Sequence, residues 1–444
     1  MTVAAGLTAS AAAVGLGWLA TESLPCFPPG RGASQHRKNQ QTETAGDQRP
    51  PIEVTGASMA PTLIGRHIEA TCNACGISWA AYGEFTAGPL KKSTVCWNCG
   101  AAVSLDTSAV QPGTAVQLIR KAADGAAFEV GSLVAVHWPS GGEYAHHAPA
   151  APAAVGAGDA GNPFALSVKR VVAGPGQRVT HRNGQLLVDG MPILPEQSWI
   201  PVHDDSHRRA GESWWQLPPA GDSASVDQTA GGFRLWPGGR DAAPTAEPAS
   251  GWLVYHHRSV HNHMRPDVIR DDVPGNVTEV RALLPVSRLR LSLQLKGSKA
   301  GTLEVAFWQE AAVDVHRLAF SSGSSELQLI GPRFRVTTGS TSELSTAPLP
   351  AAMFPELNGQ RPIAVRIVTG AAEITQLRID RPLEYRIDPR LAAKREWPIR
   401  LAADEYYLLG DNVPLSIDSR HFGPIGRGRI VGRIEPVRYD EARR

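Results

Sequence analysis

Residues 405–420 read EYYLLGDNVPLSIDSR, and this stretch decides more about the fold than any other. Its first five residues are apolar or aromatic apart from Glu405, which indicates a buried strand. The strand runs into GDN at 410–412 and then SIDSR at 416–420, a turn crowded with short polar side chains. Such a turn is either a hydrogen-bonded loop without chemistry or one wall of a catalytic site. Taken alone, the stretch leaves both interpretations open.

Two earlier stretches carry side chains that can react. The first is GASMAPTL at 56–63, where Ser58 stands between small residues. A lone serine is more often simply solvated, and the glycine that an α/β-hydrolase elbow needs two residues later is replaced by Ala60. The second is VKRVVAGPG at 168–176, where Lys169 lies in an apolar strand. Because burying an unpaired cation is costly, Lys169 is either a surface lysine or a base that has lost its proton.

In this order, the three stretches together resemble the bacterial type I signal peptidases, membrane-anchored Ser–Lys proteases that cleave exported preproteins. That family shows Ser-Met-x-Pro-Thr-Leu, then Lys-Arg with Pro-Gly shortly after, then Gly-Asp-Asn-x-x-x-Ser-x-Asp-Ser-Arg. This chain matches the first and last motifs almost letter for letter. The resemblance covers residues 51–67, 104–139, 166–190 and 400–435. It implies a membrane-associated serine endopeptidase that removes signal peptides after small residues of the Ala-x-Ala type.

The resemblance also implies a role for each matched side chain. Ser58 would be the nucleophile, Lys169 its general base, and Ser416 the hydroxyl that orients the lysine. Supporting salt bridges are implied for Arg170, Asp411, Asp418 and Arg420, and a substrate groove for Met59 and Pro61. A lysine has an ordinary pKa near ~10.4, so a base working at pH 7 must have its pKa lowered by burial. The backbone N–H of Ser58 is the expected first donor to the oxyanion, with Thr55 or water as the second.

Residues 1–21 carry no charged side chain and are mostly Ala, Gly, Leu and Val. About 20 apolar residues span a bilayer, so we expect a weak membrane anchor, followed by a Pro/Gly-rich linker up to residue 50. The alternative is a start-site artefact or a loose apolar tail. The resemblance places the catalytic part on the outer (periplasmic) face of the bacterial cytoplasmic membrane. The basic residues after the segment (Arg31, Arg37 and Lys38) favour the opposite orientation.

The cysteines form a second strong pattern. Four of the five are paired by spacing, Cys72-x₂-Cys75 and Cys96-x₂-Cys99. This spacing is typical of a structural zinc ribbon, so we expect a zinc ion and a ribbon inserted at residues 68–103. Four cysteine ligands leave no open position, and we expect no catalytic metal and no organic cofactor. Disulfides are the alternative, because the outer face of the membrane is oxidising.

The remaining sequence favours strands over helices. AVQLIR at 115–120 and SLVAVHWP at 132–139 look like strands, and RVTHRNGQLLVDG at 178–190 is a hairpin candidate. Between residues 195 and 395 many short alternating stretches, such as LRLSLQLK at 289–296, predict an inserted antiparallel β-sandwich. The fold class is therefore mainly β. We expect a signal-peptidase-type catalytic core at 51–194 and 396–444, with the zinc ribbon and the sandwich as insertions.

Composition limits the other function classes. Hydrophobic residues make up 42% of the 444 residues, enough to build cores, and the net charge of +2 argues against a nucleic-acid partner. The expected partners are preprotein signal peptides and the membrane surface. The alternative function is a catalytically silent homologue that acts as a surface β-sandwich binding module. A further cluster, His256, His257, His261 and His263, is either a metal site or a group of solvated or hydrogen-bonded side chains.

Overall fold

The computed structural model describes residues 50–82, 92–120, 127–137, 166–193, 198–208, 213–216, 226–229, 232–236, 251–276, 282–286, 288–310, 312–331, 333–334, 341–355 and 357–437. Within these ranges the chain is mainly β, as predicted. The helices there are α1 (Pro389–Ala392), α2 (Ser419–Phe422) and short 3-10 turns. No helix of the described ranges has the length and apolar character needed to cross a bilayer. The predicted anchor at 1–21 and nearly all of the linker that follows it lie outside these residues.

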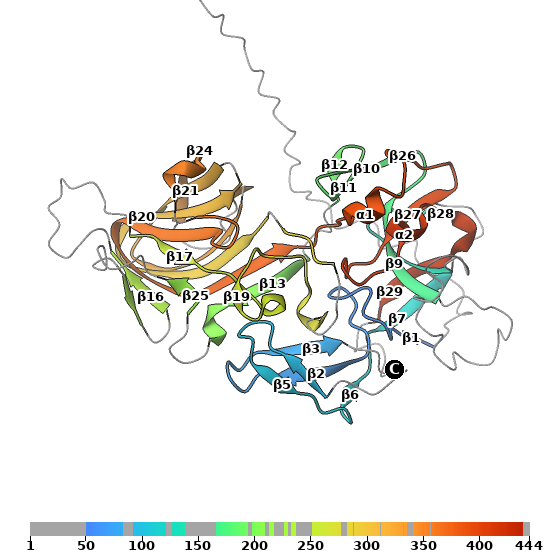
Figure 1. Cartoon of the computed structure of the whole chain (residues 1–444), viewed down its shortest axis with the longest axis horizontal. Helices are drawn as coiled ribbons and strands as arrows, with labels where there is room; N and C mark the ends of the chain where they lie inside the picture. Colours follow the sequence, from blue (N-terminus) through green and yellow to red (C-terminus); the bar gives the residue numbers. More distant parts are fainter. Residues whose placement is uncertain are drawn as a thin grey trace, which may run out of the picture. The chain divides into compact units, whose positions relative to one another are not determined.

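A seven-stranded antiparallel sheet contains the strand of Lys169 and the strand that precedes the Gly-Asp-Asn turn (Figure 1). Its strands, in spatial order, are β1 (Ile52–Glu53), β7 (Ala115–Arg120), β29 (Ile430–Pro436), β8 (Leu133–His137), β9 (Leu166–Ala173), β27 (Glu405–Leu409) and β28 (Ile425–Gly426). The strands predicted at 115–120 and 132–139 are thus confirmed as β7 and β8. Successive side chains of a strand face opposite sides, so Leu133 joins a core cluster with Met59 while Val134 joins another with Tyr406. Both faces of β8 are therefore covered.

A smaller four-stranded sheet contains the predicted hairpin. Its strands are β12 (Met191–Pro192), β11 (Gln185–Val188), β10 (Arg178–Arg182) and β26 (Ile399–Arg400). The turn between β10 and β11 consists of Asn183 and Gly184, both with positive φ (50° and 79°). Asn-Gly is the residue pair that tolerates this conformation best, which is why the sequence predicted the hairpin correctly.

The four-cysteine segment forms two small sheets. One contains β2 (His67–Thr71), β3 (Ser78–Tyr82) and β6 (Val110–Gln111); the other contains β4 (Ser93–Val95) and β5 (Ala102–Ser104). Each Cys-x₂-Cys pair forms the turn of a hairpin, between β2 and β3 and between β4 and β5. The apolar cluster of this segment includes three of the cysteines with Trp79 and Val103. The cysteines are thus part of a very small core.

The segment predicted as an insertion, residues 195–395 and called the inserted region below, forms an eleven-stranded antiparallel sheet where the structure describes it. Its strands are β13 (Trp199–Asp204), β14 (Trp215–Gln216), β15 (Val226–Gln228), β16 (Gly232–Leu235), β17 (Leu253–Tyr255), β20 (Arg290–Gln309), β21 (Ala312–Phe320), β22 (Gly323–Ile330), β23 (Arg333–Phe334), β24 (Thr341–Pro350) and β25 (Ile363–Pro382). The pair β18 (Arg258–Ser259) and β19 (Arg265–Pro266) stands apart from it. The 3-10 turns of this region are η2 (Asp205–His207), η4 (Val260–Asn262), η5 (Pro274–Asn276) and η6 (Ala351–Met353). A further 3-10 turn, η7 (Arg427–Arg429), precedes β29 of the seven-stranded sheet.

Two long strands replace several short ones predicted from the sequence. The stretch 289–296 was expected as one of many short strands, but it forms only the first part of the long strand β20, which pairs along most of its length with β25 (Figure 1). The glycines of β20 are accommodated by register shifts and do not end the strand. At Gly301 a Cβ would lie 2.0 Å from the carbonyl oxygen of Thr369, so the close approach of the two backbones requires glycine there.

One core cluster joins residues on both sides of the expected insertion boundaries. Ile200, Val273 and Tyr385 come from the segment 195–395, yet they belong to the same cluster as Val172 of β9 and Leu409 of β27. The predicted boundaries at 194/195 and 395/396 remain a prediction, but the apolar packing crosses them. The inserted region is therefore fixed to the sheet that carries Lys169 by a shared core as well as by its chain connections.

Candidate active site and four-cysteine centre

Lys169 connects the three sequence motifs, at 56–63, 168–176 and 410–420, through its hydrogen bonds. It lies on β9, paired with Val134 of β8, and only 2% of its surface is exposed. Its Nζ lies 3.1 Å from the Oγ of Ser58 and 3.1 Å from the Oγ of Ser416. The two serines are far apart in sequence from each other and from the lysine. The fold thus brings the three side chains into one hydrogen-bonded group.

The surroundings of Lys169 favour its neutral form. Burial lowers its pKa from 10.5 to about 8, and the nearby Arg420 contributes in the same direction. The carboxylates of Asp418 and Asp411 act in the opposite direction but do not cancel the effect of burial. The result is a lysine that is partly deprotonated near neutral pH. Such an amine can accept a proton from a hydroxyl within hydrogen-bond distance.

The backbone around Ser58 is fixed by the loop that follows β27. The N–H of Asn412 donates to the carbonyl oxygen of Ser58 (3.0 Å), and the Asn412 amide group donates to that of Ala57 (3.0 Å). Gly410 is required at this crossing, since a Cβ there would lie 2.1 Å from the Oγ of Ser416 and 2.6 Å from the carbonyl oxygen of Ser58. The glycine of the Gly-Asp-Asn turn therefore allows Ser58 and Ser416 to approach each other.

Asp418 and Arg420 form a buried ion pair that shapes the same loop. The Nε and one terminal nitrogen of Arg420 donate to the two carboxylate oxygens at 2.8 and 2.7 Å. Asp418 also accepts from the N–H of Gly410 and caps α2. Burial raises the pKa of Asp418, but Arg420 more than offsets this, and the net direction is downward. The charged pair thereby restricts the loop that carries Ser416, because Asp418 bonds both to Gly410 before this loop and to α2 after it.

Asp411 is the second buried carboxylate of the site. Arg170, the neighbour of Lys169 on β9, donates to it through Nε at 3.0 Å. The hydroxyl of Tyr385 donates at 2.6 Å, and the hydroxyl of Thr62 donates to the other oxygen. Asp411 is therefore hydrogen-bonded to three separate parts of the chain: Thr62 of the serine segment, Arg170 of β9 and Tyr385 of the predicted insertion.

The structure brings together most of the residues predicted for the site. Ser58, Lys169 and Ser416 are in contact, and the four residues expected to form salt bridges pair as Arg170–Asp411 and Arg420–Asp418. Met59 is placed differently from the other predicted residues: it is 1% exposed and lies in the core with Leu63. Pro61 is half-buried beside it.

Three contributing residues were missed by sequence reasoning. Thr62 is part of the Ser-Met-x-Pro-Thr-Leu motif, so the motif itself offered a signal. Tyr385 and Asn276 lie in stretches with no motif, and nothing in their local sequence distinguishes them. Their contacts with Asp411 and Asn412 depend on how the inserted region folds back.

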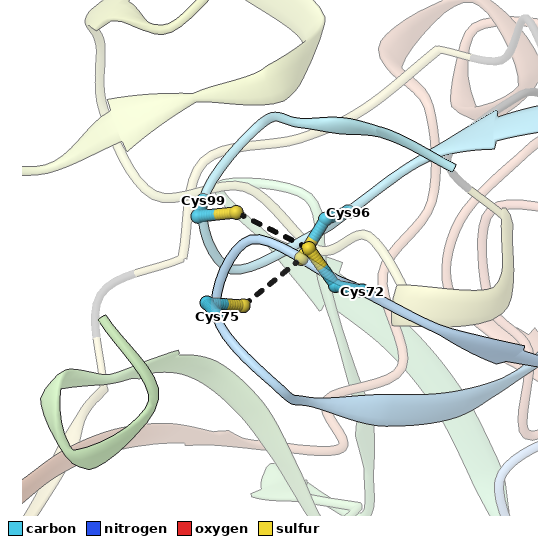
Figure 2. A group of neighbouring side chains, drawn as sticks. All are labelled: Cys72, Cys75, Cys96 and Cys99. Carbon is cyan, nitrogen blue, oxygen red and sulfur yellow. Dashed lines mark hydrogen bonds between the residues drawn. The ribbon is translucent and has the colours of Figure 1, made fainter. Parts of the chain in front are cut away.

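The four predicted cysteines also come together (Figure 2). Their Sγ atoms all lie within 4.8 Å of one another, with 3.6 Å between Cys72 and Cys99 and 3.7 Å between Cys75 and Cys96. Zinc with sulfur ligands at about 2.3 Å in tetrahedral geometry requires sulfurs about 3.8 Å apart, whereas a disulfide requires about 2.05 Å. The arrangement fits a metal ion. Among the described residues no second cluster of this kind occurs, and the histidines at 256–263 do not form one.

The two turns of this centre have the same backbone hydrogen bonds. The N–H of Cys72 bonds to Ile77 and that of Gly76 bonds back to Cys72, while Cys96, Ala101 and Gly100 repeat the pattern. Gly76 and Gly100 both have positive φ (78° and 71°), which glycine tolerates best. Two equivalent turns thus present the four sulfurs from opposite sides.

Comparison with known families agrees with this site. A family model described as signal peptidase, peptidase S26, matches residues 50–228 and 378–439, more than half of the chain. Fold and site thus define a serine peptidase of the signal peptidase kind. The chain belongs to the signal peptidase family, peptidase S26. The match leaves out residues 229–377 and resumes at 378, before the predicted restart of the catalytic core at 396.

Other comparisons add little. No curated protein sequence matches the chain. Among solved structures, a bifunctional GH43–CE protein of Bacteroides eggerthii is similar at 14% identity, over 62% of this chain and 31% of its own length, with a TM-score of 0.17. This chain thus spans about a third of that protein, and the likeness carries no argument about fold or function.

Proposed function

We propose that this protein cleaves signal peptides from exported preproteins, with Ser58 as the nucleophile and Lys169 as the general base. The observation that carries the proposal is the position of the buried Lys169 Nζ, 3.1 Å from the Ser58 hydroxyl. A serine hydroxyl is a weak nucleophile until a neighbouring base removes its proton. Among the described residues, Lys169 is the titratable side chain that hydrogen-bonds to the Oγ of Ser58.

The proposed reaction has two stages. In the first, Ser58 Oγ attacks the scissile carbonyl carbon while its proton moves to Lys169 Nζ. The tetrahedral intermediate then collapses, the C–N bond breaks, and Lys169 returns that proton to the leaving amine. In the second stage a water molecule gives a proton to Lys169 and attacks the acyl carbon. The C–Oγ bond then breaks, Lys169 returns this proton to Ser58 Oγ, and the released carboxylic acid loses its own proton to solvent. Lysine is thus neutral at the start of each stage.

Ser416 and the two ion pairs have supporting roles in this proposal. The Ser416 hydroxyl restricts the Nζ of Lys169 to a position from which it reaches Ser58. The pairs Arg420–Asp418 and Arg170–Asp411 fix the loop and the strand that carry these groups. The backbone N–H of Ser58 is the proposed donor to the oxyanion.

The proposed substrate has small side chains of the Ala-x-Ala type before the cleaved bond. This part rests on membership of the family, as does the proposed location on the outer face of the cytoplasmic membrane with residues 1–21 as the anchor. Pro61 is proposed to border the substrate groove, as the family resemblance implies. Met59 contributes from beneath, through the core cluster that it shares with Leu63 and Val168.

We also propose that Cys72, Cys75, Cys96 and Cys99 hold a structural zinc ion. The sulfur separations fit a tetrahedral ion, and a cluster of so few apolar residues is a weak core without one. With four protein ligands the ion would have no position for substrate. Its contribution would be to stability.

The proposed function is tested with synthetic peptides that carry Ala at the third and first positions before the expected cleavage site. We expect mass spectrometry to show a single cut after the second of these alanines. A matched peptide with Phe at the first position should remain uncut. Cleavage of both peptides at equal rates, or no cleavage of the first by the folded protein, would contradict the assignment.

A further inference from the structure

Asn276 makes an unusual contact between the inserted region and the loop after β27. It is the last residue of η5 and only 2% exposed. Its amide group donates to Oδ1 of Asn412 at 2.6 Å, and the amide group of Asn412 donates back to Oδ1 of Asn276 at 3.0 Å. The two side chains thus satisfy each other in a site without exposed surface. A buried amide without a partner is strongly disfavoured, so each side chain holds the other in place.

Asn412 passes this constraint to the nucleophile segment. The same amide group that bonds to Asn276 also donates to the carbonyl oxygen of Ala57, and the backbone N–H of Asn412 donates to that of Ser58. The orientation of the Asn412 amide therefore decides where the 57–58 backbone is held. Within the described residues, neither asparagine side chain hydrogen-bonds to the side chain of Ser58 or Lys169.

The segment that carries Asn276 is held in place by its own packing and hydrogen bonds. Val273 lies in the core cluster that includes Val172 and Leu409, and the N–H of Asn276 bonds to the carbonyl of Val273 at 2.8 Å. Gly275 packs directly on β3, where a Cβ would lie 2.2 Å from the ring of Tyr82 and 2.6 Å from the carbonyl oxygen of Ala80. Asn276 is therefore presented from a fixed position between the cysteine segment and the catalytic sheet.

We propose that Asn276 is a positioning residue for peptide cleavage, acting through Asn412 on the backbone of Ser58. This inference rests on the proposed role of Ser58 as the nucleophile. Without Asn276, the Nδ2 group of Asn412 loses one of its two acceptors, and Oδ1 of Asn412 loses its donor. The amide of Asn412 is then no longer held, and the 57–58 segment becomes free to shift. Because catalysis depends on the position of the attacking oxygen, such a shift lowers kcat more than it changes KM.

The test compares Asn276→Ala and Asn276→Leu with the wild-type chain on the alanine-containing peptide. The leucine variant keeps about the volume of the side chain and removes both hydrogen bonds. A fall of kcat in this variant therefore does not come from a cavity, which the alanine variant would leave. We expect kcat to fall by about tenfold or more in both variants, with KM within about twofold. All assays are run below the thermal unfolding midpoint of the variant in question.

Glu304→Gln is the matched control. Glu304 is 2% exposed and pairs with Arg317 and Arg366 within the eleven-stranded sheet, so its substitution also disturbs a buried polar contact of the inserted region. We expect its kcat to remain at the wild-type value. An equal fall of kcat in Glu304→Gln would show general loosening and overturn the proposal. So would a wild-type kcat in either folded Asn276 variant.

Ser58→Ala separates this inference from the proposed function. If Ser58→Ala is inactive and the Asn276 variants are fully active, only the positioning role is wrong. If Ser58→Ala cleaves the peptide at the wild-type rate, the proposed nucleophile is wrong, and the positioning role is wrong with it.

Discussion

At the scale of single residues, the behaviour of Lys169 depends on the balance between burial and two carboxylates. Burial removes the ammonium group from water, while Asp418 and Asp411 stabilise its charge. Arg170 and Arg420 are paired with these same carboxylates, which weakens their pull on the lysine. The ion pairs therefore allow a lysine to sit near two acids and still have a lowered pKa.

We expect the cleavage rate to rise with pH through about 8. Because Lys169 works as a base only when neutral, activity is low where the ammonium form dominates and reaches a plateau above its pKa, lowered to about 8. The check is a profile of kcat/KM between about pH 5.5 and 9.5. A rate that already reaches its plateau below about pH 6 would point to a carboxylate or another base.

Residue-level prediction from the sequence went furthest where a motif resembled a known family. Ser58, Lys169 and Ser416 each lie in a stretch that resembles a signal peptidase motif, so their proximity could be expected from that resemblance before the fold. Tyr385 and Asn276 could not, because a single Tyr or Asn carries no local pattern. Their importance lies in contacts with Asp411 and Asn412, which arise only when distant segments pack together.

At the scale of elements, the cysteine segment depends on its turns more than on its apolar side chains. Two equivalent hairpin turns bring the sulfurs together, and the surrounding cluster contains few large residues. The sequence predicted this element well because the Cys-x₂-Cys spacing encodes the turn directly. It predicted the inserted sheet less well, because alternation shows a strand but not whether two stretches belong to the same strand.

We expect one zinc ion per chain, bound by the four cysteines. Cys96→Ser should lose the metal and lower the thermal unfolding midpoint, whereas Cys26→Ser, the matched control, should keep both at wild-type values. Metal content is measured by elemental analysis. Thiol titration of the unfolded protein without reductant should find all 5 cysteines free. A single free thiol would instead establish disulfides.

At the scale of the whole molecule, the inserted region shares a hydrophobic core with the sheet that carries Lys169. It contributes Ile200, Val273 and Tyr385 to the core that also contains Val172. The end of β25 runs beside β13, with Arg378 opposite Asp204. These two positions are therefore natural points for removing the outer part of the insertion, since neighbouring chain ends tolerate a short connection.

Two deletions of different extent should behave differently. Replacing residues 205–377 by a short Gly/Asn turn keeps Ile200 and Tyr385 in place and removes Asn276. We expect this variant to fold and to cleave the peptide with a lowered kcat. Replacing 195–395 also removes Tyr385 and its contact with Asp411, and we expect no turnover. Circular dichroism and peptide cleavage are the measurements. Full activity of the larger deletion would show that the insertion is independent of the site.

The most direct test of the central claim is a double-mutant cycle on Ser58 and Lys169, read as kcat on the alanine-containing peptide. Two residues that act as one unit show strong non-additivity. We therefore expect Ser58→Ala, Lys169→Ala and the double variant to lose activity to the same low level, with thermal unfolding that still shows a folded chain. Substantial turnover by Ser58→Ala, or a double variant slower than each single variant by the product of their separate losses, would contradict a Ser58–Lys169 dyad.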